Sequence, residues 1–293
     1  MTQPLLELQA ADWKPALPAA EAAATTAALE NGQVLFLPRL AFALSAEEKL
    51  FLSPQIGDGK AKNVSYDPAA REVRHTSALG GDRAVLAAMM DRYANAARGL
   101  LAALCPAYTR ELQWGLTSFR PVSAANREAS VRKDDMRLHL DAFVSRPVQG
   151  RRLLRVFCNV NPDGQPRVWN VGEPFDAVVE RFRGRIGAPL PGSAWLMEKL
   201  HITKGRRSPY DHIMLGLHDQ AKLDDGYQQS SPKTRVELPA NTTWIVFTDL
   251  VMHAVLSGQY LLEQTFYLPP AAMQDEARSP LRRLERVYGQ ALA

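Results

Sequence analysis

Short runs of strand-forming residues in the second half of the chain constrain the fold more than any other feature. They fall at residues 112–121, 136–143, 152–162 and 167–171, and resume at 234–249, around His253 and at 258–269. Strands at this spacing are typical of an antiparallel sandwich or barrel. We therefore expect a mainly β core, a jelly roll in which strands far apart in sequence become neighbours.

Helical patterns surround and interrupt these strands. An Ala-rich stretch, 18–32, predicts a helix that ends at Gly32, and Ser45 with Glu48 forms a capping-box spacing. The longest pattern, 82–104, has the broad apolar stripe of a helix packed on a sheet. Further helices are expected at 173–187, at 192–200 and at the C-terminus, and a short strand at 34–38.

No linker rich in Gly, Pro or Ser divides the chain, so we expect one domain over residues 1–293. Residues 1–111 would form a mainly helical support region. Residues 112–268 would form the jelly-roll core, with a helical insertion at about 173–220. Residues 269–293 would form the C-terminal helix.

Composition narrows the setting of the protein. No apolar run approaches the roughly 20 residues that a membrane span needs, and the N-terminal stretch does not have the pattern of a secretory signal. Cys105 and Cys158 lie far apart, which favours free thiols in a reducing cytoplasm. The net charge of +4 favours anionic partners, but no pattern indicates a nucleic-acid module.

A His-x-Asp pair in the run MRLHLDAF is the main candidate for chemistry. In a strand, Arg137, His139, Asp141 and Phe143 would share one face, while the leucines between them would face the core. A later histidine, His253, completes two histidines and one carboxylate, the facial triad of non-haem Fe(II) oxygenases. The alternative is a buried structural pair, His139 with Asp141, and an unrelated His253.

Three expected strands carry an arginine on a polar or aromatic side. Arg155 shares its side with Phe157, Arg120 lies beside Ser118, and Arg167 beside Trp169. A buried arginine needs a counter-charge, so we expect a basic interior that takes an anionic ligand. The alternative is that these arginines lie at exposed strand ends.

Several longer segments resemble one family. RLHLDAFVSRP, LLRVFCNVNPDGQPRVWNVGEPF and SPYDHIMLGLHDQAKLDDGYQ, with the late MHAV, resemble the 3-deoxy-D-manno-oct-2-ulosonic acid (Kdo) hydroxylases of Gram-negative bacteria. This resemblance implies a double-stranded β-helix core and a dioxygenase that uses Fe(II), 2-oxoglutarate and O2. It also implies hydroxylation of Kdo at C3, which gives Ko in the inner core of lipopolysaccharide.

The resemblance assigns roles to particular residues. His139, Asp141 and His253 would ligate iron and form the catalytic centre. Many 2-oxoglutarate oxygenases have an arginine about ten residues beyond the distal histidine, where this chain has Glu263 and Gln264. The resemblance instead points to cosubstrate binding by four other residues, of which Arg155 is favoured. They are Arg120, Arg155, Arg167 and Trp169.

Other features suit the implied substrate. His212, His218 and Asp219 are rival metal ligands, and we expect them either to line a sugar site or to be structural. Kdo carries a carboxylate and lipid A carries phosphates, so the basic segment 199–207, otherwise a solvated loop, would meet an anionic membrane surface. The expected location is the cytoplasm, either free or peripheral to the inner membrane. The alternatives are a non-catalytic barrel that binds an anionic sugar lipid, and the same chemistry on another anionic substrate.

Overall fold

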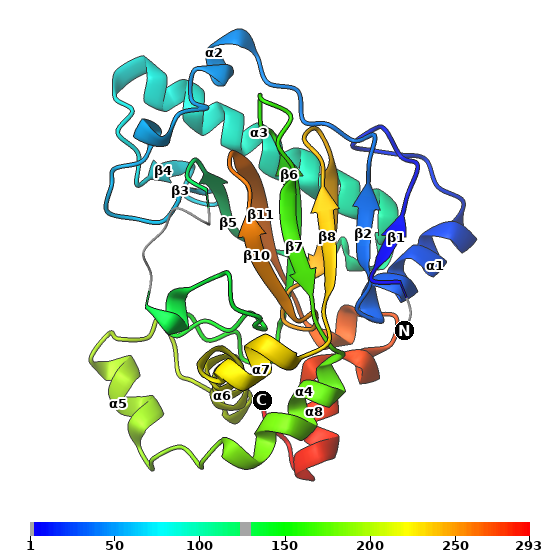
Figure 1. Ribbon diagram of the computed structural model, residues 1–293, viewed down its shortest axis with the longest axis vertical. Coiled ribbons are helices and arrows are strands. Elements are labelled where there is room, and N and C mark those ends of the chain that lie inside the picture. Colours follow the sequence, from blue (N-terminus) through cyan, green and yellow to red (C-terminus); the bar gives the residue numbers. More distant parts are fainter. Residues whose placement is uncertain (1–2, 124–129) are drawn as a thin grey trace.

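A computed structural model describes residues 3–123 and 130–293. The chain forms a large sheet of eight strands, and a second sheet of three strands faces it (Figure 1). In spatial order the large sheet contains β1 (Leu5–Glu7), β2 (Val34–Leu37), β9 (Thr243–Phe247), β6 (Arg152–Asn159), β11 (Leu261–Leu268), β5 (Gln113–Arg120), β3 (Val64–Asp67) and β4 (Glu72–Arg74). The small sheet contains β10 (His253–Ser257), β7 (Arg167–Val171) and β8 (Thr234–Leu238). Among the strands of the described residues, β1 and β2 alone pair in parallel.

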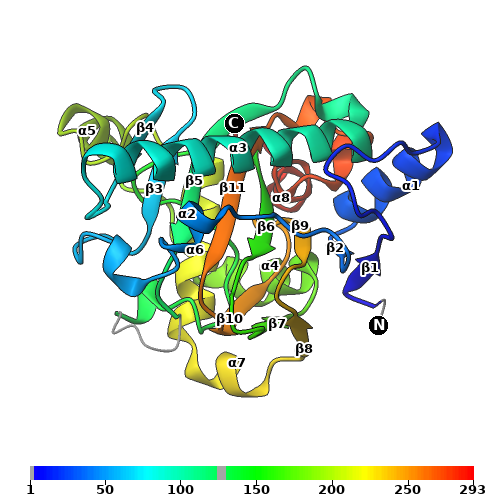
Figure 2. The ribbon, with the colours of Figure 1, turned by 90° about the horizontal axis from the view of Figure 1, so that it is seen from above.

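A long helix covers the outer face of the large sheet, as the apolar stripe predicts (Figure 2). This helix, α3 (Gly80–Leu104), buries Leu86, Met89 and Tyr93 against β5, β6 and β11. The Tyr93 hydroxyl donates a hydrogen bond to the carbonyl oxygen of Val156 at 2.9 Å. Two predicted N-terminal features are also confirmed. They are α1 (Ala19–Glu30), followed by Gly32 at φ +88°, and α2 (Ala46–Lys49), with its Ser45–Glu48 capping box.

The inner face of the large sheet packs on the small sheet. Phe157 stacks on Trp244 with ring centroids 5.3 Å apart, and Trp169 of the small sheet meets both rings edge-on. Strand β6 alternates as expected, since Phe157 faces this inner layer and Cys158 faces α3. The fold is therefore mixed α and β, built on a large sheet, with an inter-sheet space in which one end is apolar.

Four helices form an insertion between β7 and β8. They are α4 (Phe175–Phe182), α5 (Ser193–Lys199), α6 (Pro209–Leu223) and α7 (Asp225–Ser230). Val171 and Thr234 are direct partners in the antiparallel pair of β7 and β8. The segment 172–233 therefore begins and ends at neighbouring positions of the small sheet. The insertion is thus longer than the expected 173–220. The C-terminal helix is α8 (Pro280–Tyr288), and the N-terminal region adds four short strands to the edges of the large sheet.

The prediction of a regular strand at 136–143 is wrong. Met136 lies in a turn and Arg137 in a bend, and within this segment only His139 forms a bridge, with His253. Gln228 of α7 takes the place of a neighbouring strand: its Oε1 accepts from the Leu138 N–H at 2.8 Å, and its Nε2 donates to the Leu138 carbonyl at 3.0 Å. Leu138 still faces the core, but Arg137 turns away to pair with Asp225.

Within residues 3–123 and 130–293, no helix is both long enough and apolar enough to cross a lipid bilayer.

Candidate metal centre and cavity

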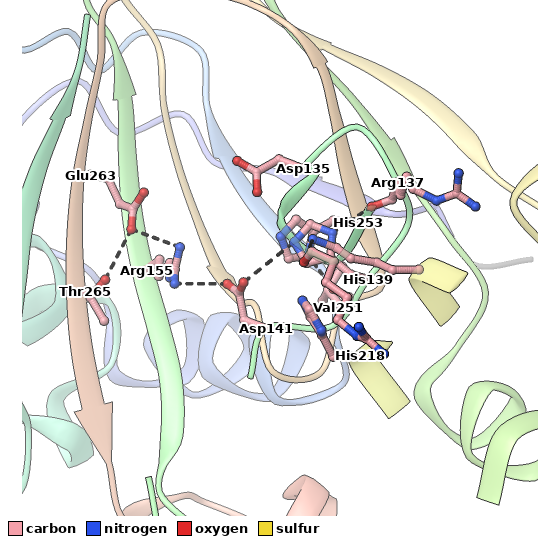
Figure 3. Close-up of polar contacts among 12 residues, drawn as sticks. Asp135, Arg137, His139, Asp141, Arg155, His218, Val251, His253, Glu263 and Thr265 are labelled. Carbon is pink, nitrogen blue, oxygen red and sulfur yellow. Dashed lines mark hydrogen bonds and ion pairs between the residues drawn. The ribbon is translucent and has the colours of Figure 1, made fainter. Parts of the chain in front are cut away.

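Two histidines and an aspartate converge at the polar end of the inter-sheet space (Figure 3). One ligand atom from each of His139, Asp141 and His253 lies within 4.8 Å of the others. The backbone brings them together, because the N–H of each histidine donates to the carbonyl of the other at 2.9 and 3.0 Å. Asp141 is fixed by its own N–H, which donates to the Thr248 carbonyl at 2.8 Å.

Both imidazole rings are oriented by backbone carbonyls. His139 Nδ1 lies 2.7 Å from the Arg137 carbonyl oxygen, and His253 Nδ1 lies 2.8 Å from that of Val251. A carbonyl oxygen only accepts hydrogen bonds, so Nδ1 carries the proton in each ring. The Nε2 atoms keep their lone pairs, which is the arrangement that metal-binding histidines adopt. Trp169 stacks on the His253 ring with centroids 5.1 Å apart and holds its plane.

Burial and neighbouring charges shift the pKa values of these three side chains toward the protonation states that bind a cation. Burial lowers the pKa of His139 well below its usual value, and the neighbouring His253 and Lys222 lower it further. Burial also lowers the pKa of His253. Burial alone would raise the pKa of Asp141, but the Arg155 guanidinium and the two histidines hold it well below the usual range. The site therefore offers two neutral imidazoles and one carboxylate at neutral pH.

The residues fit a metal ion. Asp141 Oδ2 is buried and accepts no hydrogen bond, although Arg155 Nη2 lies 3.1 Å away as an ion-pair partner. A buried carboxylate oxygen without a hydrogen bond is unfavourable, and a bound cation would satisfy it. Two nitrogens and one oxygen from one side match the facial triad of non-haem Fe(II) sites.

The expected arginines surround the same cavity. Arg120, Arg155, Arg167 and Trp169 all line it, and each is less than a tenth exposed. The alternative in which the arginines lie at exposed strand ends is therefore wrong. Arg167 Nη1 donates to the Gly258 carbonyl at 2.9 Å, which holds its side chain at the β10–β11 turn.

We expected an anionic ligand to balance the buried arginines, but the protein itself supplies one of the balancing charges. Glu263 lies between two of the arginines: Arg120 Nε donates to its Oε2 at 2.9 Å, and Arg155 Nη1 lies 3.0 Å from its Oε1. Burial would raise the pKa of Glu263, but Arg120 and Arg155 lower it. Glu263 is thus an internal counter-ion at a position where the sequence indicated only the absence of an arginine.

The cavity as a whole remains strongly basic. It has a volume of about 590 Å³, and its described lining contains eight Lys and Arg side chains against three carboxylates. The carboxylates are Asp135, Asp141 and Glu263. Besides the three arginines named above, the cations are Lys62, Arg132, Lys133, Arg146 and Lys222. This excess of positive charge suits an anionic ligand larger than a single carboxylate.

The three other candidate metal ligands, His212, His218 and Asp219, all lie on α6, but they face different surroundings. His218 lines the cavity, and its ring meets the His139 ring edge-on with centroids 5.6 Å apart. Asp219 accepts from His218 Nδ1 at 2.9 Å, and His212 instead contacts the Gly187 carbonyl at 2.8 Å, outside this cavity. Lys222 was not expected from the sequence. Its spacing of four from His218 is the signal that would have found it, since such residues share a helix face.

Comparisons with known proteins identify the family of this chain. The profile of the 3-deoxy-D-manno-oct-2-ulosonic acid (Kdo) hydroxylase family matches residues 12–291. No curated protein gives a significant match. A crystal structure of the Kdo hydroxylase KdoO, a non-haem Fe(II) α-ketoglutarate-dependent dioxygenase, in complex with α-ketoglutarate and Fe(III), is 43% identical, with a TM-score of 0.96 over 99% of this chain and 98% of that one.

A second KdoO structure, in complex with cobalt(II), is 44% identical, with a TM-score of 0.97 over 99% of this chain and 97% of that one. Both matches span essentially the whole of each chain, and the family profile covers all but the two ends of the sequence. The chain therefore belongs to the Kdo hydroxylase family.

Proposed function

We propose that this protein is an Fe(II)- and 2-oxoglutarate-dependent dioxygenase that hydroxylates Kdo at C3, which gives Ko in the Kdo–lipid A inner core of lipopolysaccharide. The observation that carries the proposal is the His139–Asp141–His253 cluster inside a strongly basic cavity. Similar structures of KdoO contain α-ketoglutarate with Fe(III), and succinate with Fe(III). These are the cosubstrate and the coproduct that the reaction requires.

The three ligand residues have distinct roles in this proposal. His139 and His253 hold the metal through Nε2, and their Nδ1–carbonyl bonds keep the rings in place. Asp141 supplies the anionic ligand, which Arg155 keeps ionised. When bound, iron with 2-oxoglutarate and O2 supplies the oxidation that replaces a C–H bond of the sugar by C–OH.

Arg155 is the proposed partner of the far carboxylate of 2-oxoglutarate. Its guanidinium lies beside the proposed metal ligand Asp141 and pairs with Glu263 on the other side (Figure 3). These two ion pairs fix the orientation of the guanidinium next to the metal centre. Planar guanidinium groups bind carboxylates in a bidentate manner. Arg120, Arg167 and Trp169 would complete the cosubstrate pocket, as they line the same cavity.

We also propose that the core is a double-stranded β-helix within a single domain of residues 1–293. The support is the arrangement of two facing, mostly antiparallel sheets that share one apolar layer, with the candidate metal ligands at its polar end. The N-terminal strands and α3 belong to the same packed body, because α3 packs on β5 and β11 of that core.

The proposed acceptor is anchored in a membrane, and one surface fits such a contact. It comprises α5 with its flanking segments, and we call it the α5 surface. Its large apolar side chains are 50 to 78% exposed: Leu190, Trp195, Leu196, Leu200 and Ile202. Lys199, Lys204 and Arg206 are exposed among them. Exposed aromatic and aliphatic groups with interspersed cations are the pattern of a segment that enters the interface of an anionic bilayer.

The α5 surface adjoins the cavity. The Lys204 N–H donates to the Ser145 carbonyl at 2.8 Å, and Arg207 Nη2 donates to the Val144 carbonyl at 2.8 Å. Val144 and Ser145 line the cavity. We therefore propose that the protein binds the anionic inner membrane peripherally through the α5 surface, from the cytoplasmic side, with the cavity close to the lipid-linked sugar.

One experiment tests the reaction. Kdo–lipid A is incubated with the protein, Fe(II), 2-oxoglutarate and air, and its mass is measured. The expected result is a gain of one oxygen on the sugar that His139→Ala abolishes. His212→Ala is the matched control, because this histidine lies outside the cavity and should leave the reaction unchanged.

Other outcomes identify the alternatives. Succinate release without oxygen on Kdo would keep the oxygenase and indicate another anionic substrate. Binding of the sugar lipid that survives His139→Ala, with no succinate from the iron-loaded protein, would indicate a non-catalytic barrel.

A further inference from the structure

One buried cation in the cavity is not used by the proposed cosubstrate site. Lys222 lies near the end of α6, is only 2% exposed and lines the cavity. Its ammonium donates to the Arg132 carbonyl at 3.2 Å, and among the described residues it forms no ion pair. Arg120 and Arg155, in contrast, both face Glu263.

A buried ammonium that meets only a backbone carbonyl is poorly compensated. Removing a charge from water is costly unless an opposite charge replaces the lost hydration. Burial accordingly lowers the pKa of Lys222, while Asp135 and Asp141 counteract this from a distance. The remaining donors of the ammonium are therefore suited to an anionic group that enters the cavity.

His218 lies one helical turn before Lys222 and lines the same side of the cavity. Its Nδ1 lies 2.9 Å from Asp219 Oδ1, and Arg132 Nε donates to Oδ2 of the same carboxylate at 3.1 Å. The edge-on contact with His139 places this ring beside the candidate metal centre.

The two sides of the metal centre differ in origin. Arg155 and Glu263 come from the large sheet, whereas His218 and Lys222 come from the insertion. Figure 3 shows Asp141 between Arg155 and His218. A 2-oxoglutarate held by Arg155 would therefore leave the α6 side of the cavity for the acceptor.

We propose that Lys222 binds the carboxylate of the acceptor sugar. This inference rests on the proposed function, since it identifies a residue that orients the acceptor in that site. It makes Lys222 a specificity residue: a sugar acid is bound, and a neutral sugar of the same shape is not.

Calorimetry on the Co(II)-loaded protein with 2-oxoglutarate tests the inference without turnover. The probes are the methyl glycoside of Kdo and the same glycoside with its carboxylate converted to a primary amide. Wild-type protein should bind the carboxylate form about tenfold to a hundredfold more tightly, as a charged hydrogen bond contributes this much. Lys222→Met should bind both forms equally, with its affinity for 2-oxoglutarate unchanged.

Two further variants complete the test. Lys222→Gln keeps a polar side chain in case the methionine variant is poorly folded, and it should also bind both forms equally. Lys49→Met is the matched control on the exposed surface of α2 and should keep the wild-type ratio.

Three results would overturn the inference. They are a wild-type ratio in both Lys222 variants, a loss of 2-oxoglutarate affinity instead, and no measurable binding of either glycoside to the wild-type protein. If the ratios behave as expected but Kdo–lipid A gains no oxygen, the anion site stands and the proposed reaction fails.

Discussion

Arg155 faces two carboxylates at once, the proposed metal ligand Asp141 and the counter-ion Glu263. Arg155→Lys would keep the positive charge but lose the planar fork. We expect the KM for 2-oxoglutarate to rise by about tenfold or more, while the affinity for the Kdo glycoside changes little. Arg235→Lys, at an exposed position on β8, is the control. Equal effects on both ligands would argue against Arg155 as the cosubstrate residue.

Glu263 predicts how stability depends on pH. Its pKa is lowered from 4.5 in the folded chain, so its ionised form stabilises the fold. This contribution is fully present above the unfolded pKa and is lost as the pH falls through the lowered folded pKa. In urea titrations of metal-free protein, Glu263→Gln should have a shallower loss of unfolding free energy than wild type between about pH 5 and pH 3. Parallel curves would contradict this assignment.

The two thiols are expected to be inert. Burial raises the pKa of Cys158 to about 11 and that of Cys105 to about 12, and both are free and buried, as the sequence predicted. The thiolate is the reactive form, so iodoacetamide at pH 8 should leave both unmodified in the folded protein and alkylate both in denaturant. Mass spectrometry measures the modification, and rapid labelling of the native protein would show that one thiol is accessible.

At the scale of elements, the spacing of apolar residues predicted helices and strands correctly where one face of the element packs on the core. It placed α3 and the strands β5, β6, β7 and β11, because each has one apolar side that must be covered. It failed at 136–143, where a side-chain amide from Gln228 replaces a strand. It also missed Glu263 and Lys222, because their roles depend on which charges face them across the cavity.

The turn between β10 and β11 controls one arginine of the cavity. Gly258 has φ +118°, and a Cβ there would lie 2.7 Å from Arg167 Cδ and 2.9 Å from Arg167 Cα. Gly258→Ala should therefore lower the free energy of unfolding by roughly 2–4 kcal/mol, as backbone strain and overpacking add. It should also raise the KM for 2-oxoglutarate through displacement of Arg167.

Gly164→Ala distinguishes the effect of backbone strain at positive φ from the effect of a steric clash with Arg167. Gly164 has φ +74°, but a Cβ there meets nothing within 4 Å. Thermal unfolding should show only the strain component, about 1 kcal/mol, with an unchanged KM. Identical losses for both variants would mean that contact with Arg167 is unimportant.

At the scale of the whole molecule, the α5 surface predicts membrane binding. Trp195→Ser with Leu200→Ser should reduce co-sedimentation with vesicles of anionic lipid, and binding of the wild type should weaken as salt rises. Affinity for the soluble Kdo glycoside should stay the same. Leu50→Ser with Leu79→Ser removes two leucines that are each 78% exposed elsewhere, and it is the control. Equal wild-type binding to neutral and anionic vesicles would remove the electrostatic part of the proposal.

The pairing of Val171 with Thr234 has a wider consequence. Residues 172–233 form one long connection between the paired strands β7 and β8. This connection contains His218, Lys222 and the α5 surface. The proposed metal ligands and the proposed cosubstrate arginines lie outside it. The proposed recognition of the acceptor and the proposed oxidation chemistry therefore come from separable segments of the chain. A relative could exchange this one loop and acquire a new acceptor, while its oxidising machinery stayed intact.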